Sequence, residues 1–165
     1  MSAPAYLPEF AAAEYRRRSD YAQRFVSAGT WSRDEATAKL RPWLAIALLC
    51  SANMDDLGLL PDVREQLDAH LADHRWRDQN GSWHYTDGEC RSVVAHDFIC
   101  PRITWAPELA RARDAAFDAA AKDPAAADHA AGIAAICMAI GHDHNGRHHV
   151  FPYRGIAASP IKAVA

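Results

Sequence analysis

Hydrophobic residues recur every three or four positions over two long parts of the chain, residues 1–76 and 105–141. Apolar residues at this spacing fall on one face of an α-helix, so the pattern predicts amphipathic helices. The spacing and the breaks between periodic segments predict five helices, over residues 8–28, 32–48, 61–75, 106–123 and 125–140.

Local signals indicate where the first two helices begin and end. Pro8 is suited to a first helical turn, and Gly29 is a typical residue just beyond a helix. Ser32 and Glu35 have the spacing of a capping box, in which each side chain accepts a hydrogen bond from the backbone N–H of the other residue. Pro42 lies inside the second helix and cannot donate a backbone hydrogen bond, so we expect a kink or a break there.

The helical pattern is interrupted between residues 76 and 105, where aromatic and β-branched residues are frequent. The segments "QNGS" and "TDGE" contain dipeptides that favour tight turns. These features predict two or three short strands, over residues 82–85, 91–95 and 98–99. The expected fold class is therefore mainly α (α+β), a bundle of about five helices with a small antiparallel β insert near residues 80–100.

The length of 165 residues fits a single domain over residues 1–165. Within it we expect helical parts over residues 1–76 and 105–141. The β insert covers residues 79–104, and residues 142–165 form a C-terminal tail.

The composition narrows the classes of function. The formal net charge of −3 argues against a protein that coats nucleic acid by charge alone. No run reaches the roughly 18 consecutive apolar residues of a membrane span, so no membrane association is expected. The start "MSAPAYLPEF" lacks the basic and apolar regions of a secretory signal. We therefore expect a cytoplasmic protein with reduced thiols.

The four cysteines fall into two kinds. Cys50 and Cys137 lie in apolar helical sequence and are expected to be small buried residues. Cys90 and Cys100 lie in polar, turn-rich sequence near His96, with Cys-x5-His-x3-Cys spacing.

The tail adds further histidines to this candidate metal site. Thiolate and imidazole are ligands that zinc prefers, and a small β insert would gain stability from a bound metal. The predicted site is a structural zinc centre joining the insert to the tail, with the ligands Cys90, His96, Cys100, His142, His144 and His148. The alternative is that the cysteines are ordinary residues of a hairpin and the histidines lie on the surface around a turn.

A metal-dependent hydrolase that uses the histidine-rich segment 142–149 is the alternative function. "AAICMAIGHDHNG" resembles the signature of HD phosphohydrolases, in which His142 and Asp143 would bind a metal, although no aspartate follows Asp143. "HHVFPYRG" resembles the opening of an HNH nuclease motif, in which His148 would be a metal ligand and His149 the general base. That family carries a later asparagine and histidine, which residues 156–165 do not contain.

Two groups of side chains are candidates for partner binding. A basic run in the first helix could contact phosphate or an acidic partner, although Glu14 and Asp20 partly neutralise it. Aromatic residues in and beside the β insert could form an anchor surface, because Trp, Tyr and Arg dominate binding hot spots. The alternatives are that the basic run is an ordinary solvated helix face and that the aromatic residues pack in the core. The candidate residues are Arg16, Arg17, Arg18, Trp76, Trp83 and Tyr85.

Residues 14–49, "EYRRRSDYAQRFVSAGTWSRDEATAKLRPWLAIALL", resemble a segment of small bacteriophage and prophage proteins. The shared pattern is a basic aromatic helix, a short "AG" turn and an acidic capping box that opens an amphipathic helix. The resemblance implies an accessory protein in the host cytoplasm that binds a host protein, including proteins of host defence systems. Nucleic acid is the other class of partner that the basic run and the aromatic residues suggest.

Overall fold

The computed structural model describes residues 7–75 and 87–141, and all of their regular secondary structure is helical. The six α-helices of these residues are α1 (Leu7–Ser27), α2 (Arg33–Leu49), α3 (Pro61–Arg75), α4 (Asp87–Val94), α5 (Arg102–Lys122) and α6 (Ala127–Ile140). Three short helical turns lie between them: η1 (Met54–Asp56), the π-helical η2 (Ala95–Ile99) and η3 (Pro124–Ala126). Within these residues no helix is both long enough and apolar enough to span a membrane.

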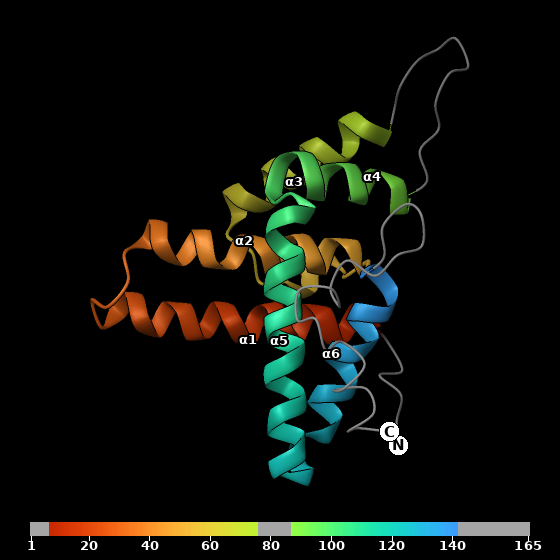
Figure 1. Ribbon diagram of the computed structural model, residues 1–165. Coiled ribbons are helices and arrows are strands. Elements are labelled where there is room, and N and C mark those ends of the chain that lie inside the picture. Colours follow the sequence, from red (N-terminus) through yellow and green to blue (C-terminus); the bar gives the residue numbers. More distant parts are fainter. Residues whose placement is uncertain (1–6, 76–86, 142–165) are drawn as a thin grey trace.

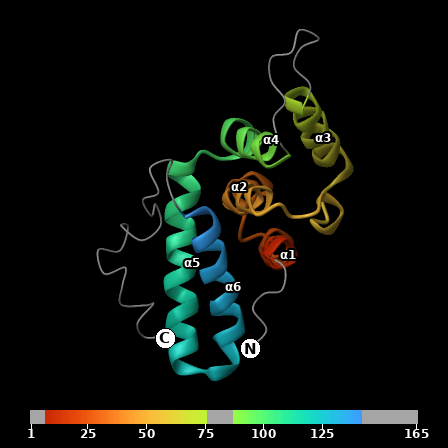
Figure 2. The ribbon, with the colours of Figure 1, turned by 90° about the vertical axis from the view of Figure 1, so that its right-hand side faces the viewer.

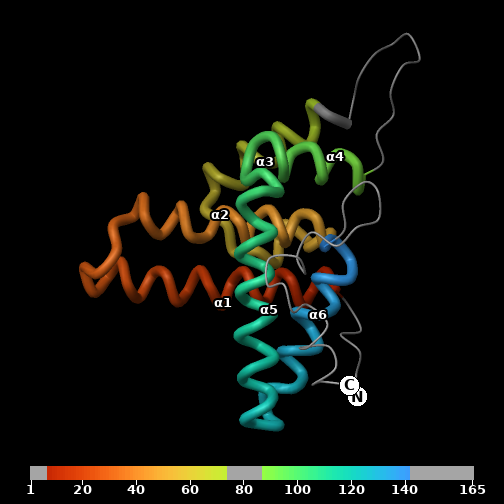
Figure 3. The backbone as a smooth tube through the Cα atoms, in the orientation of Figure 1, coloured from red at the N-terminus to blue at the C-terminus, as the bar shows by residue number. Residues whose placement is uncertain are grey.

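Two helical hairpins form most of the fold. Helices α1 and α2 lie side by side, as do α5 and α6, and the first hairpin crosses the second (Figure 1). Helix α4 packs against α2 and α3, on the side of α2 away from α1 (Figure 2). The turn that joins α1 to α2 extends beyond the rest of the described chain (Figure 3). This projecting end is therefore open on several sides.

The second half of α2 is the centre of the hydrophobic core. Trp43, Ile46 and Leu48 are almost completely buried, because α2 packs against α1, α4, η2 and α5. A helix that is apolar around its whole circumference is stable only when it is enclosed in this way. The break or kink expected at Pro42 does not divide this helix, since α2 continues through Pro42 to Leu49. Burial of the helical turns after Pro42 offsets the loss of the backbone hydrogen bond that proline cannot donate.

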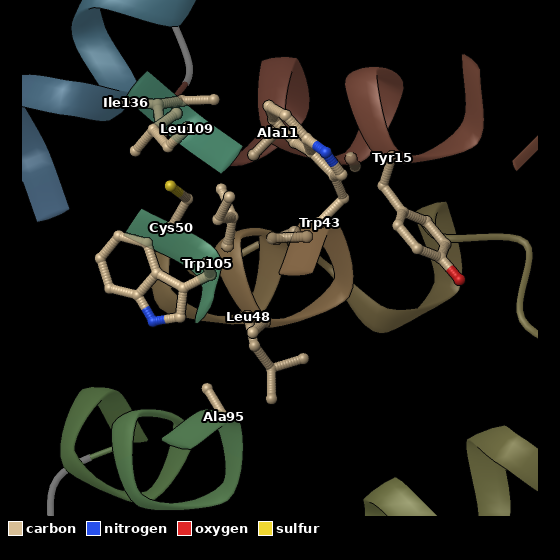
Figure 4. Packing of buried hydrophobic residues seen from close by; sticks show 14 of the residues in the cluster. Ala11, Tyr15, Trp43, Leu48, Cys50, Ala95, Trp105, Leu109 and Ile136 are labelled. Carbon is tan, nitrogen blue, oxygen red and sulfur yellow. The ribbon is translucent and has the colours of Figure 1, made fainter. Parts of the chain in front are cut away.

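Cys50 and Cys137 are buried in this core, as the sequence predicted. Figure 4 shows Cys50 among Trp105, Leu109 and Ile136, side chains that come from α5 and α6. Burial raises the pKa of both thiols to about 12. They are therefore protonated near neutral pH and are packing residues, because the thiolate is the reactive form of cysteine.

The predicted β insert is wrong for the part of it that the structure describes. Residues 91–95 lie in α4 and the start of η2, and residues 98–99 complete η2, so neither segment is a strand. Residues 82–85, the third predicted strand, lie outside the described residues. The described chain is all-helical, which corrects the α+β class to an α class.

Tertiary contacts explain why this β-branched segment is helical. Cys90 and Val94 are one helical turn apart and completely buried where α4 meets α2 and α3. At the start of α4, Arg91 donates to the Asp87 carboxylate (Nε–Oδ2 3.1 Å) and to the Ala52 carbonyl (Nη1–O 2.7 Å). Packing and these hydrogen bonds outweigh the intrinsic strand preference of the segment. This preference is weak, because the whole scale of strand propensities spans only about 1 kcal/mol.

The helix boundaries follow local signals where those signals are strong. Helix α1 ends just before Gly29, whose φ of +75° suits glycine, and α3 spans the predicted residues 61–75. The capping box at the start of α2 is confirmed: Glu35 N donates to Ser32 Oγ (3.0 Å) and Ser32 N donates to Glu35 Oε2 (2.7 Å). Helix α5 begins at Arg102, four residues before the predicted start.

Replacing the capping serine is expected to destabilise the protein. Ser32→Ala removes the acceptor for the Glu35 N–H, so the free energy of unfolding should fall by about 1 kcal/mol. Urea unfolding followed by circular dichroism measures the change. Thr30→Ala, an exposed position in the same turn, is the control and should change the stability by less than about 0.5 kcal/mol. Equal effects of the two substitutions would contradict this role of the cap.

Candidate functional site

The predicted zinc ligands of the insert lie in and beside α4 and η2. Cys90 is completely buried in α4, and Cys100 is buried just after η2. The ring of His96 is partly buried, and its Nδ1 lies 2.8 Å from the Ser92 carbonyl oxygen, to which it donates. This bond holds the imidazole against its own helix.

Among the described residues, no group of three or more His, Cys, Asp and Glu side chains is placed to hold a metal ion. The other predicted ligands, His142, His144 and His148, lie outside these residues. The zinc site therefore stays a prediction, as does the hydrolase alternative that depends on residues 142–149.

The structure describes only some of the predicted partner-binding residues. Trp76, Trp83 and Tyr85 lie outside the described residues. The basic run Arg16–Arg18 lies on α1, and two of its three arginines bind a single carboxylate, that of Glu14.

Glu14 is only 3% exposed and is surrounded by cationic groups. Its Oε1 accepts from Arg17 Nη2 (2.7 Å) and Arg18 Nε (2.9 Å), and its Oε2 lies 3.0 Å from His129 Nε2 on α6. Burial alone raises the pKa of a carboxyl group, but the hydrogen bonds from Arg17 and His129 and the charges of Arg17 and Arg18 outweigh it and lower the pKa of Glu14. Glu14 therefore joins α1 to α6 as a buried carboxylate.

The three arginines of the run are not equivalent. The guanidinium of Arg18 also lies over the Trp43 ring, 3.6 Å from its centroid, so Arg18 is part of the packing between α1 and α2. Arg17 is bound to Glu14 but its side chain is 59% exposed. Arg16 is exposed and forms no ion pair with any residue that the structure describes. The run therefore exposes Arg16 and part of Arg17 to solvent.

A cluster of aromatic rings lies at the projecting end of the α1–α2 hairpin. Phe25 and Trp31 stack with their centroids 4.5 Å apart, and Tyr21 lies 4.8 Å from Phe25. Lys39 Nζ lies 5.0 Å from the centroid of the Trp31 ring. Tyr21 is 54% exposed, and the other two rings are partly exposed. We call Tyr21, Phe25 and Trp31 the tip cluster.

The backbone of the turn holds the tip cluster in place. The carbonyl of Phe25 accepts hydrogen bonds from the backbone N–H groups of Thr30 (2.9 Å) and Trp31 (3.2 Å). These bonds fold the residues after α1 back over its last turn, so that the Trp31 ring reaches Phe25. The cluster is therefore pre-organised in the free protein.

A groove of about 560 Å³ runs between α1 and α2. It is lined by residues 15–27 of α1 and 33–44 of α2, and residues 58–63 line it near the start of α3. Its charged lining residues, among those that the structure describes, are Arg33 and Arg41, and no carboxylate lines it. We call this feature the hairpin groove.

Sequence reasoning missed both the tip cluster and the hairpin groove. Tyr21 and Phe25 are four residues apart in the predicted first helix, and this spacing was the available signal. The contribution of Trp31 depends on the path of the turn, and the groove depends on how two helices pack. Neither is encoded in the periodicity of one helix.

Comparison of the chain with protein-family models, with curated proteins and with solved structures found no match. Function is therefore inferred from the residues and geometry of the chain itself.

Proposed function

We propose that this protein acts by binding another protein through the projecting end of the α1–α2 hairpin, in the manner of a small phage accessory protein that binds a host protein. The observation that carries the proposal is the tip cluster. Its three aromatic rings are packed together, held by backbone hydrogen bonds and partly exposed at the most open end of the fold.

Exposed aromatic rings of this kind suit a binding hot spot. Tyr and Trp bury a large area on binding and lose little conformational entropy, and they are enriched among the residues that dominate binding energy. Lys39 beside Trp31 adds a charged group next to the apolar surface. The tip cluster therefore combines an apolar centre with a polar edge, as protein interfaces do.

The charges around the cluster favour a protein partner over nucleic acid. Asp34 and Glu35 open α2 next to Trp31, and Asp20 precedes Tyr21. Nucleic acid binding depends on cations that neutralise successive phosphates. Carboxylates interleaved with the cations of the hairpin work against that requirement, whereas they are compatible with a mixed protein surface.

The substitution Tyr21→Ala, which truncates the tip cluster, is expected to weaken capture of a bacterial partner. The immobilised chain is exposed to nuclease-treated bacterial lysate, and the retained protein is then purified and titrated against each variant. Tyr21→Ala should weaken its binding at least about tenfold, because an exposed ring is lost from the centre of the contact. Unfolding curves should show that the variant remains as stable as the native chain, since Tyr21 is mostly exposed.

Arg111→Ala is the control, an exposed residue of α5 outside the α1–α2 hairpin, and it should leave the affinity unchanged. A partner that binds Tyr21→Ala and the native chain equally well would refute the proposal. So would a partner that is captured from untreated lysate but not from nuclease-treated lysate.

A further inference from the structure

The hairpin groove has the dimensions of a short helix. Its α1 wall runs from Tyr15 to Ser27, which corresponds to about 18 Å of helix axis, or roughly three turns. Its α2 wall runs from Arg33 to Leu44 over a similar length. A groove between two antiparallel helices is the setting in which amphipathic helices bind by their apolar faces.

The floor of the groove is apolar. Ala22 of α1 and Ala36 of α2 line it and are buried, and the lining residues Val26 and Leu40 are partly buried. The alanines are small, so they leave room for larger apolar side chains of a ligand. Burial of such side chains would remove apolar surface from water and so stabilise the complex.

The two charged lining residues lie along one wall. Arg33 and Arg41 are both exposed and are eight residues apart on α2, a separation of about 12 Å or two helical turns. Two carboxylates with the same separation on a ligand helix would pair with them. No carboxylate among the described lining residues competes for either guanidinium group.

The net charge of the whole hairpin also favours an acidic ligand. Residues 14–41 contain seven Arg and Lys residues and four Asp and Glu residues, a net charge of +3. The complete chain has a net charge of −3, so the remaining residues carry −6. Complementary charge increases the rate of association and selects against partners of the same sign.

The charges of the segments outside the described residues do not suit the groove. Residues 1–6 and 76–86 carry no net charge, and residues 142–165 carry +2. None of these segments contains more than one side-chain carboxylate, whereas Arg33 and Arg41 favour two. Charge therefore favours a ligand from another molecule.

We infer that the hairpin groove binds an acidic amphipathic helix of about three turns, contributed by the partner protein. This inference rests on the proposed function, and it names the chemistry of the partner. Apolar residues on one face of that helix pack onto the alanine-rich floor. Carboxylates two turns apart pair with Arg33 and Arg41.

A designed peptide tests the groove directly. The acidic probe is a fluorescein-labelled peptide of about 14 residues with leucines on one helix face and glutamates on the other. The basic comparison peptide has lysine in place of every glutamate. Fluorescence anisotropy against the full-length chain should show that the acidic peptide binds at least about tenfold more tightly than the basic one. The double substitution Arg33→Glu and Arg41→Glu should weaken binding of the acidic peptide by at least about tenfold.

The matched control is the double substitution Arg24→Glu and Arg111→Glu. These residues are exposed and change the net charge equally, but they do not line the groove. The control should change the affinity for the acidic peptide by less than about threefold, because exposed charges outside the contact are largely screened at about 0.1 M salt.

Three results would overturn the inference. The first is equal affinity for the acidic and basic peptides, and the second is an equal loss of affinity in the groove variant and its control. The third is displacement of the acidic peptide by a single-stranded oligonucleotide or by a second copy of the chain, detected by titration and by sedimentation. Loss of the bacterial partner from Tyr21→Ala, together with failure of the peptide test, would leave the proposed function standing without the groove. Unimpaired binding of that partner to Tyr21→Ala would remove the proposed function whatever the peptides show.

Discussion

Glu14→Ala is expected to lower the free energy of unfolding by about 3 kcal/mol at pH 7, the largest effect of a substitution at the α1–α6 junction. The carboxylate is buried, and its removal leaves Arg17, Arg18 and His129 without their shared acceptor. The effect is smaller than for a fully buried ion pair, because the side chains of Arg17 and His129 are 59% and 39% exposed and water partly replaces the lost bonds. Urea unfolding measures the change.

Glu14→Gln separates the charge from the packing and should cost about 2 kcal/mol at pH 7. The pKa of Glu14 is lowered in the folded protein, so its carboxylate stabilises the fold above the ordinary pKa of about 4.3. That stabilisation disappears as the pH falls below this value and through the lower pKa of the folded state. The difference in stability between the native chain and Glu14→Gln should therefore shrink as the pH falls below about 4.3.

The control for this pH series is Glu65→Gln, an exposed carboxylate on α3. Its effect on stability should stay below about 0.5 kcal/mol throughout. A difference between the native chain and Glu14→Gln that is the same at pH 7 and pH 3 would contradict the charged role assigned to Glu14.

Gly132→Val is expected to destabilise the protein by about 2 kcal/mol, because α6 crosses α1 closely at this glycine. A Cβ atom at Gly132 would lie 2.2 Å from Cε2 and Cζ of the Phe10 ring, too close for any contact between carbon atoms. Either the ring leaves its partly buried site or the helices separate, and both changes expose apolar surface to water. Thermal and urea unfolding both report the loss.

A double-mutant cycle identifies the cause. In a Phe10→Ala background the clash is absent, so Gly132→Val should cost at least about 1 kcal/mol less than in the native chain. Gly88→Val is the matched control, since a Cβ at Gly88 of α4 meets no atom within 4 Å. It should change the stability by less than about 0.5 kcal/mol. Additive effects of the substitutions at positions 10 and 132 would show that Phe10 and Gly132 are not in contact.

Features determined by neighbouring residues were predictable from the sequence. The capping box of Ser32 and Glu35, the end of α1 before Gly29 and the full extent of α3 depend on interactions within a few residues. The burial of Cys50 and Cys137 also followed, because both lie in runs of apolar residues. In each case the signal lies in the sequence of the same helix or at its end.

The prediction failed where distant contacts outweigh local preference. Residues 91–95 and 98–99 have strand-forming residues, yet burial of Cys90 and Val94 against other helices makes the segment helical. Pro42 disfavours a helix locally, but the packing of the following turns retains it. These local preferences amount to a few kcal/mol at most, which is less than the burial of several core side chains contributes.

The candidate site divides in the same way. The sequence by itself determined that Glu14 lies within about one helical turn of Arg17 and Arg18 and that residues 14–41 are basic. Only the tertiary structure decided that His129 completes the cluster around Glu14, that Trp31 folds back onto Phe25 and that the hairpin encloses an apolar groove between arginines. The physical reason is the distance along the chain between the interacting residues. Charge spacing and helix periodicity depend on residues a few positions apart, whereas the groove and the helix crossing at Gly132 form only when separate helices pack together.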